Sequence, residues 1–308
     1  MRVAFFGTPD FAVPSLRALV GEGFDVVAVV TQPDAPQGRS RSRLVPPPVK
    51  LVAEAEELLL FQPEKPTDRD FLAQLRAAGP DIGVVVAYGH ILKPDLLALP
   101  PLGMVNVHPS LLPALRGPAP VEWAIVNGLE ETGVTIMQLD AGMDTGPILH
   151  QIPDHVDPEV TGGELSEHLA EVGAQALIET LALLEQGGLK PVPQDDARAT
   201  LAPKLTREVA RIEWSRDAAS VGRLIRGLDP RPGAWTELDG TEVKLFEARV
   251  TEGRGTAGEV LTADGGLRIA TGGGGAVEVQ EVQPAGKARM AAGDWLRGAR
   301  LAAGRRFT

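Results

Sequence analysis

The first 31 residues constrain the fold most, because they show a strand pattern, a helix pattern and a second strand pattern within a short span. Val3–Phe6 is an apolar run, Phe11–Val20 has apolar residues at helical spacing, and Val26–Thr31 is rich in β-branched residues. Two strands joined through a helix pair in parallel, since a parallel connection needs a crossover. The turn at Gly7–Asp10 lacks the G-x-G-x-x-G spacing of a dinucleotide site, which disfavours a nicotinamide or flavin enzyme.

The same alternation continues to about residue 185. Helices are predicted at 49–57, 68–78, 120–127 and 163–185, and strands at 58–61, 82–87, 103–108, 134–139 and 148–152. Residues 32–48, which are rich in proline and arginine, are predicted to form one long loop. The predicted fold class is therefore α/β, with a Rossmann-like, mostly parallel sheet and helices on both faces.

The pattern changes after a glycine- and proline-rich stretch at 187–196. A helical segment near 218–227 precedes short alternating segments separated by glycine turns, at 234–238, 242–248, 257–261, 267–270 and 277–282. Several short strands of this kind predict a small OB-like β-barrel, a fold that commonly binds oligonucleotides. We therefore predict a catalytic domain at 1–189, a linker at 190–206 and a C-terminal β-barrel domain at 207–308.

The composition excludes several classes of function. The chain has no cysteine, which rules out disulfides, thiolate metal sites and a cysteine nucleophile and is typical of a reducing cytoplasm. It has no apolar run of about 18 residues and no signal-peptide pattern, so no membrane association is predicted. A net charge of −11 argues against an indiscriminate polyanion binder. No side-chain spacing suggests a metal site, and we expect a cytoplasmic monomer.

Residues 102–117 contain the candidate site with the most chemistry. Asn106 and His108 are two apart on a predicted strand, so their side chains project from the same face. Pro109 cannot donate to a sheet, so the strand is expected to end there, and Ser110–Pro113 forms a stiff apolar loop. Ligands of open α/β sheets bind at such carboxyl ends. By itself, however, His108 is equally compatible with a structural histidine at a strand end.

A third polar group, Asp144, lies in a glycine-rich loop that follows the predicted strand at 134–139. A carboxylate beside an imidazole orients it and raises its pKa, which predicts that His108 is an imidazolium at neutral pH. An imidazolium and the Asn106 amide would stabilise an oxyanion, and the carboxylate would move protons. No serine or cysteine nucleophile accompanies them, so the pattern favours acyl transfer by direct attack of an amine on the acyl donor.

With these residues the chain resembles the 10-formyltetrahydrofolate-dependent formyltransferases. The matching pieces are Gly7-Thr8-Pro9-Asp10-Phe11, Ala87-Tyr88-Gly89, Asn106-Val107-His108-Pro109-Ser110-Leu111-Leu112-Pro113, Arg116-Gly117, Thr132-Gly133-Val134-Thr135 and Asp144-Thr145-Gly146. The resemblance implies 10-formyltetrahydrofolate as the formyl donor. It implies that the catalytic residues are Asn106, His108 and Asp144. It also implies that the folate-binding residues are Ser110, Leu111, Leu112, Pro113, Tyr88, Gly89, His90, Ile91, Leu92 and Asp140.

Within that family, three further segments are similar to the members that formylate initiator methionyl-tRNA. They are Gln32-Pro33-Asp34 with Gly38-Arg39 and Pro48-Val49-Lys50, then Lys204-Leu205 with Ala210–Trp214, and Gln283–Lys287 with Met290. The resemblance implies that the 32–50 loop and the C-terminal domain contact tRNA. The residues implied in these contacts are Arg39, Arg41, Arg43 and Lys287. Here the basic residues after Arg39 alternate with serine, whereas the family pattern has an adjacent pair.

Two other functions remain open. Formylation of a small amine, such as an aminosugar nucleotide or glycinamide ribonucleotide, would use the same three catalytic residues but would leave the basic loop and the C-terminal domain without a role. A non-catalytic RNA-binding adaptor would need neither Asn106, His108 nor Asp144. Formyl transfer assays with charged tRNA and with small amines distinguish the three.

Overall fold

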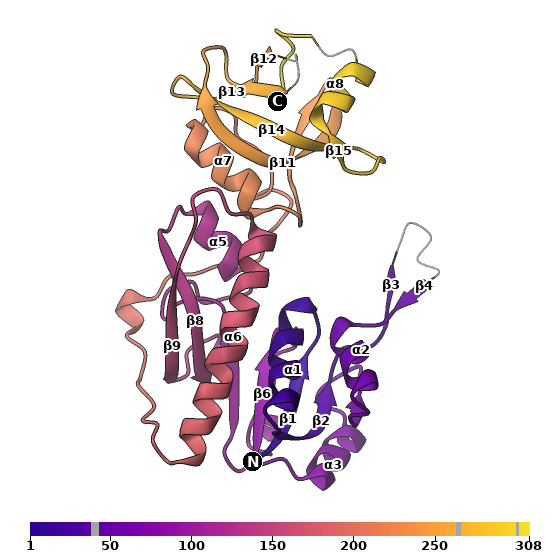
Figure 1. Ribbon diagram of the computed structural model, residues 1–308, viewed down its shortest axis with the longest axis vertical. Helices are drawn as coiled ribbons and strands as arrows, with labels where there is room; N and C mark the ends of the chain where they lie inside the picture. Colours follow the sequence, from indigo (N-terminus) through magenta and orange to yellow (C-terminus); the bar gives the residue numbers. More distant parts are fainter. Residues whose placement is uncertain (38–42, 263–265, 300–301) are drawn as a thin grey trace. The chain divides into compact units, whose positions relative to one another are not determined.

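The chain divides into two compact units (Figure 1). The computed structural model describes all residues except 38–42, 263–265 and 300–301. The first unit comprises Met1–Gly117, Thr132–Asp154 and Ser166–Leu201, and the second comprises Pro118–Glu131, His155–Leu165 and Ala202–Thr308. Each unit has its own sheet.

The first unit is built on a seven-stranded sheet with the order β5-β2-β1-β6-β7-β8-β9. Its strands β5, β2, β1, β6 and β7 pair in parallel, and β8 runs antiparallel to β7. This confirms the predicted Rossmann-like, mostly parallel sheet. The strands are β1 (Arg2–Gly7), β2 (Asp25–Val30), β5 (Leu60–Phe61), β6 (Ile82–Val86), β7 (Met104–His108), β8 (Glu131–Gln138) and β9 (Ile148–His155).

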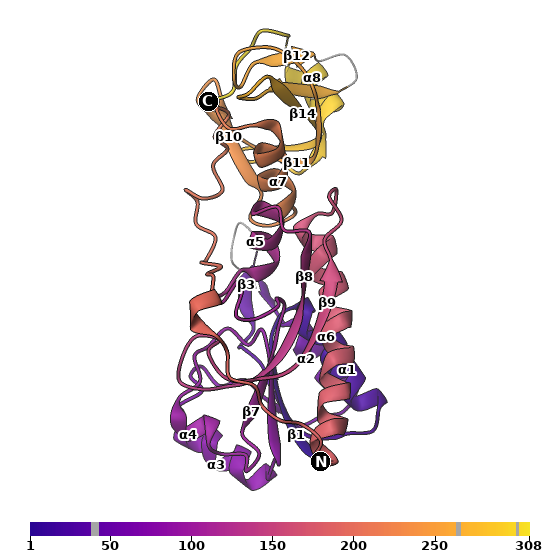
Figure 2. The same cartoon turned by 90° about the vertical axis from the view of Figure 1, so that its left-hand side faces the viewer.

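Helices cover both faces of this sheet, as Figure 2 shows. The helices α1 (Val13–Gly21) and α6 (Gly162–Glu185) lie on one face, while α3 (Arg69–Ala78) and the short α4 (Pro94–Leu97) lie on the other. The sequence determines the ends of α3, because Asp68 caps its first turn and Gly79 at φ 63° ends it. The α3 and α4 face packs Phe6, Phe71, Leu96 and Met104 into one core cluster. The α4 helix was not predicted.

The prediction of one irregular loop at 32–48 is wrong in part. β3 (Ala35–Gln37) pairs antiparallel with β4 (Arg43–Val45), and α2 (Pro48–Ala55) starts one residue before its predicted first residue. Pro36 hides the strand pattern, yet a proline is tolerated in a strand that has a free edge. Two of the predicted tRNA contacts, Arg39 and Arg41, lie outside the described residues.

The second unit contains a curved antiparallel sheet with the order β10-β11-β14-β13-β12, and β15 pairs with β14. This confirms the predicted small barrel-like domain. The strands are β10 (Ala234–Leu238), β11 (Thr241–Glu252), β12 (Val260–Thr262), β13 (Leu267–Ala270), β14 (Gly275–Pro284) and β15 (Met290–Ala291). Helix α7 (Ala218–Gly227) packs on β11 and on α5 (Pro120–Val126). Neither β15 nor α8 (Ala292–Ala299) was predicted.

The last residues of the chain join the two edge strands of the second unit. The backbone of Thr308 exchanges two hydrogen bonds with Glu237 on β10, and the Phe307 N–H donates to the Gly258 carbonyl beside β12. Phe307 is 1% exposed and packs against Trp214 and Trp295. The C-terminal segment therefore closes the sheet and removes two exposed edges.

Candidate functional site

The orientation of β7 places Asn106 and His108 on the α3 and α4 side of the sheet. Val107 points the other way, because its Cγ1 atom lies 2.8 Å from the position that a Cβ on Gly173 of α6 would occupy. Met104, which has the same parity as the two polar residues, belongs to the α3 and α4 core cluster. His108 is almost wholly buried and Asn106 is half-buried. The predicted shared face is therefore present.

Each ring nitrogen of His108 has a defined neighbour. Nε2 lies 3.0 Å from the Leu115 carbonyl oxygen, which can only accept, so Nε2 carries the proton. Nδ1 lies 3.8 Å from Asp144 Oδ2. The same carboxylate oxygen accepts a hydrogen bond from the Gly117 N–H at 2.9 Å. The structure thus brings Asp144 to the imidazole, as the sequence pattern predicted.

Burial controls the protonation of His108. Desolvation lowers the pKa of His108 below its ordinary value of 6.5, and the nearby Asp144 carboxylate and the Leu115 carbonyl only partly oppose this. The imidazole is therefore neutral at neutral pH in the free protein. The prediction that His108 is an imidazolium at neutral pH is therefore wrong. The Asp144 carboxylate does raise the pKa of His108, but burial removes water from the imidazole and lowers the pKa by more.

A network of hydrogen bonds holds the loop that follows β7. The Thr135 hydroxyl on β8 donates to the Ser110 carbonyl at 2.6 Å and accepts from the Leu112 N–H at 3.1 Å. The Gln151 amide on β9 donates to the Leu112 carbonyl and to Thr135 Oγ1. The Ser110 hydroxyl donates to the Ala114 carbonyl at 2.6 Å. Thr135 was part of a matching motif, whereas nothing in the sequence pattern pointed to Gln151.

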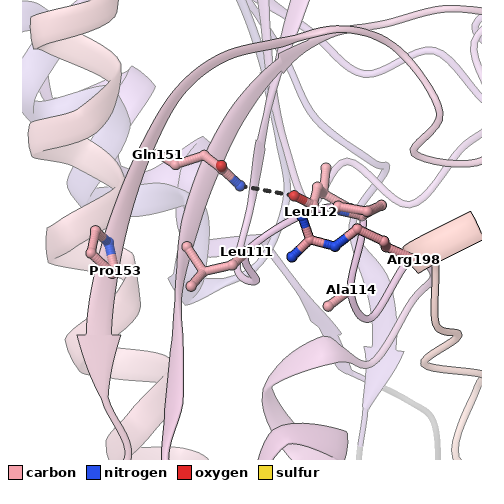
Figure 3. A pocket seen from close by; sticks show the side chains of 7 residues that line it. Leu111, Leu112, Ala114, Gln151, Pro153 and Arg198 are labelled. Atoms are coloured by element: carbon pink, nitrogen blue, oxygen red, sulfur yellow. Dashed lines mark hydrogen bonds between the residues drawn. The ribbon is translucent and has the colours of Figure 1, made fainter. Parts of the chain in front are cut away.

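One side of this loop borders a cavity of about 350 Å³. Figure 3 shows Gln151 and Pro153 of β9 on one side, Ala114 and Arg198 on the other, and Leu111 between them. Of the predicted folate-binding residues, the lining includes Leu111, Leu112 and Pro113. The complete lining is Leu111, Leu112, Pro113, Ala114, Gln151, Pro153 and Arg198.

The other predicted folate-binding residues lie away from this cavity lining. Tyr88 is buried in the α3 and α4 core with its ring edge on Phe6, and burial raises the pKa of Tyr88 to about 12. By contrast, Gly89, His90 and Ile91 are exposed, with Ile91 at 84%.

Leu92, the last residue predicted in this segment, is half-buried. Asp140 is exposed, and it accepts hydrogen bonds from the Thr145 hydroxyl and the Gly142 N–H. The folate-binding roles of this group stay predictions.

Part of the predicted linker holds the loop that carries Asp144. The Gln194 amide donates to the carbonyls of Asp144 and Gly146 at 2.8 and 2.7 Å. Arg116, which is buried, donates to Gln194 Oε1 and to the Asp196 carboxylate. In the sequence this stretch stands out only as proline-rich, and no pattern points to Gln194.

Two of the predicted tRNA-binding residues, Arg43 and Lys287, lie within the described residues. Arg43 lies on β4, and Lys287 is exposed in the turn between β14 and β15. Within the described residues, no helix is long and apolar enough to cross a membrane, and no group of three or more histidine or acidic side chains could hold a metal ion.

Comparison with known proteins gives matches over both units. Residues 1–181 match the family described as formyl transferase, and residues 204–300 match the formyl transferase C-terminal domain. A methionyl-tRNA formyltransferase of Geotalea daltonii is 46% identical over 305 residues, which is 99% of this chain and 97% of that protein. The methionyl-tRNA formyltransferase of Desulfotalea psychrophila is 47% identical over 306 residues, covering 98% and 94%.

A solved structure with a similar fold is HypX from Aquifex aeolicus in complex with tetrahydrofolic acid. It superimposes with a TM-score of 0.67 at 21% identity and covers 96% of this chain and 47% of HypX. At this identity the likeness concerns the fold alone.

Proposed function

This chain belongs to the formyl transferase family, and from that premise we propose that it transfers the formyl group of 10-formyltetrahydrofolate to the α-amine of initiator methionyl-tRNA. The near-full-length identity of 46% to a relative named methionyl-tRNA formyltransferase supports this acceptor. A second relative named methionyl-tRNA formyltransferase, 47% identical over 306 residues, supports it too.

The observation that carries the chemistry is the Asp144 carboxylate, 3.8 Å from His108 Nδ1 on the sheet face that also presents Asn106. No hydrogen bond of the Asn106 side chain is present within the described residues, so its amide is available as a donor to a substrate oxygen. A neutral imidazole, a carboxylate and a free amide at one strand end suit formyl transfer between two nitrogens.

The proposed reaction begins with the amine nitrogen attacking the formyl carbon. The nitrogen gains positive charge and the carbonyl oxygen becomes an oxyanion, which the Asn106 amide stabilises. Nδ1 of His108 has a lone pair because Nε2 carries the proton, so Nδ1 accepts the proton that the amine loses. Asp144 stabilises the imidazolium thus formed. Return of this proton to N10 of the folate completes cleavage of the bond between N10 and the formyl carbon.

Residues around the site fit a folate cosubstrate. Two large apolar side chains are exposed here, Ile91 at 84% within the predicted folate-binding segment and Met143 at 58% in the loop that follows Asp140. An apolar surface beside a few polar groups is typical of small-molecule sites. We therefore assign Tyr88–Leu92, Asp140 and Ser110–Pro113 to folate binding, with Tyr88 supporting its segment from the core.

The C-terminal domain at 207–308 is the proposed tRNA-binding domain, joined by the 190–206 linker to the catalytic domain at 1–189. Lys287 contributes an exposed cation there, and Arg39, Arg41 and Arg43 are the proposed contacts to the acceptor end. We propose that the protein acts as a cytoplasmic monomer.

Formyl incorporation from labelled 10-formyltetrahydrofolate tests the function. The acceptors are charged initiator tRNA, charged elongator tRNA and small amines such as glycinamide ribonucleotide. We expect incorporation into the initiator tRNA with strong preference over the elongator. Incorporation confined to small amines would overturn the tRNA assignment, and no incorporation into any acceptor would favour a binding protein without catalysis.

A further inference from the structure

We propose that the 194–200 segment, which lies in the first unit, positions the two groups that move the proton during formyl transfer. Gln194 holds the backbone at Asp144, and Thr200 holds the backbone that binds His108. The inference rests on the proposed function and deepens it by naming two positioning residues for that reaction. Each acts through main-chain groups rather than on the reacting atoms.

Two residues beside the site have backbone conformations that residues with a side chain rarely adopt. Leu115 has φ 59° and Asp144 has φ 54°, which places both in the left-handed region. Aspartate is tolerated there more easily than a bulky leucine. Such conformations persist where surrounding contacts hold them, and they cluster at active sites. The Leu115 carbonyl accepts the Nε2 proton of His108 at 3.0 Å, so the conformation of Leu115 bears directly on the imidazole.

The Gln194 amide holds the backbone of the Asp144 loop. Its nitrogen donates to the carbonyls of Asp144 at 2.8 Å and Gly146 at 2.7 Å. Its oxygen accepts from the guanidinium of the buried Arg116 at 2.7 and 3.0 Å. The carbonyls can only accept and the guanidinium can only donate, so the amide has a single orientation. A side chain with both an amide donor and an amide acceptor is therefore needed at this position.

Thr200 holds the other residue with a left-handed backbone. Its hydroxyl oxygen accepts from the Leu115 N–H at 2.8 Å. Its own N–H donates to the Pro113 carbonyl at 3.3 Å, and its carbonyl accepts from the Arg116 N–H at 2.9 Å. Removal of the hydroxyl would leave the Leu115 N–H without its partner, and an unpaired N–H favours rearrangement of the backbone around it.

The gap between the two proton-transfer groups depends on this support. His108 Nδ1 and Asp144 Oδ2 are 3.8 Å apart, which is longer than a hydrogen bond. Gln194 sets the position of the carboxylate, and Thr200 sets the orientation of the imidazole through Leu115, so a shift of either backbone changes the gap. A displacement of about 1 Å can lower a rate about 100-fold. The segment should therefore affect turnover more than substrate affinity.

Gln194→Glu tests the first contact and keeps the shape of the side chain. One carboxylate oxygen still accepts from Arg116, but the other faces the carbonyls of Asp144 and Gly146 in place of the donating nitrogen. We expect kcat for charged initiator tRNA to fall about 100-fold, with KM for both substrates within about threefold of wild type. Gln175→Glu makes the same change on exposed α6 and is the matched control with wild-type kcat.

Thr200→Val tests the second contact, since valine has the same shape and no hydroxyl. We expect kcat to fall about tenfold, the effect of one lost hydrogen bond, again without a rise in KM. Thr200→Ser keeps the hydroxyl and should restore most of the activity. Thr67→Val removes a hydroxyl from an exposed turn and is the matched control. A role confined to stability would lower the melting temperature and leave the kcat of the folded protein unchanged.

NMR of isotope-labelled histidine gives a readout that needs no turnover. The Leu115 carbonyl protects the Nε2 proton of His108 from exchange with water, so Thr200→Val should speed that exchange while Thr200→Ser should not. The proposal is overturned if folded Gln194→Glu keeps kcat within about threefold of wild type, or if Thr200→Val leaves both kcat and the exchange unchanged. A rise in KM alone would also overturn it, because the segment would then bind substrate.

Wild-type protein assayed in parallel separates this proposal from the proposed function. If wild type formylates charged initiator tRNA while Gln194→Glu and Thr200→Val retain full activity, only the positioning roles are wrong. If wild type formylates no acceptor, the proposed function fails, and the exchange of the His108 Nε2 proton still decides whether Thr200 positions the imidazole.

Discussion

Replacing Asp144 by asparagine removes one charge from the site and keeps its shape. Asp144 Oδ2 accepts from the Gly117 N–H at 2.9 Å and faces His108 Nδ1 at 3.8 Å. An asparagine oxygen can take the same position and retain the Gly117 hydrogen bond. The substitution therefore isolates the electrostatic contribution of the carboxylate to the imidazolium that forms during the reaction.

The geometry sets the expected magnitude. At about 4 Å, opposite charges attract by about 1 kcal/mol in water and by about 4 kcal/mol at an effective dielectric constant of 20. Since about 1.36 kcal/mol corresponds to a tenfold change in rate, the loss lies between about fivefold and about 1,000-fold. The side chains of His108 and Asp144 are only 5% and 18% exposed, so water screens them poorly. We expect kcat/KM to fall by about 100- to 1,000-fold.

Single-turnover formyl transfer to charged initiator tRNA measures this loss. The dissociation constants for tRNA and tetrahydrofolate should change little, because the substitution adds no bulk. Asp95→Asn removes a charge from exposed α4 and is the matched control with wild-type activity. A correctly folded Asp144→Asn variant with kcat/KM within about threefold of wild type would refute the role of Asp144.

His108→Ala and Asn106→Ala should each lower kcat about 100- to 1,000-fold, the usual loss for one oxyanion or proton-transfer group, while filter-binding assays show tRNA affinity retained. Because burial lowers the pKa of His108, an NMR pH titration of the free protein should show its imidazole protonated only below pH 6.5; a titration at or above pH 6.5 would contradict this. Phe307→Ala should destabilise the second unit by about 3–5 kcal/mol in denaturant titrations, since Phe307 is fully buried where the chain end closes the sheet; a loss under about 1 kcal/mol would contradict this packing role. A plot of the logarithm of tRNA affinity against the logarithm of salt concentration should fall with a slope of about 0.7–0.9 for each phosphate contacted. Lys287→Ala should make this slope shallower by about 0.7–0.9, the contribution of one phosphate. An unchanged slope would show that Lys287 does not contact the RNA.

Local periodicity explains why much of the site was predictable. The two-residue repeat of a strand places Asn106 and His108 on one face whatever surrounds them. Pro109 ends the strand for a covalent reason, and the alternation of strands and helices implies a parallel sheet. The nearness of Asp144 did not follow from the strand order, because β8 runs antiparallel to β7 and ends beside Met104 rather than beside His108. The β3 and β4 pair was missed because its proline and arginine residues carry no strand periodicity.

Tertiary structure decided what depends on residues distant in the chain. The sequence by itself determined which groups could act together, namely an amide, an imidazole and a carboxylate. It did not determine the protonation of His108, because desolvation comes from the packed surroundings and outweighs the Asp144 carboxylate. Gln194 became a support of the Asp144 loop only because the segment that follows α6 packs on the first unit. Such contacts join residues 50 positions apart and leave no local pattern, so only the folded structure reveals them.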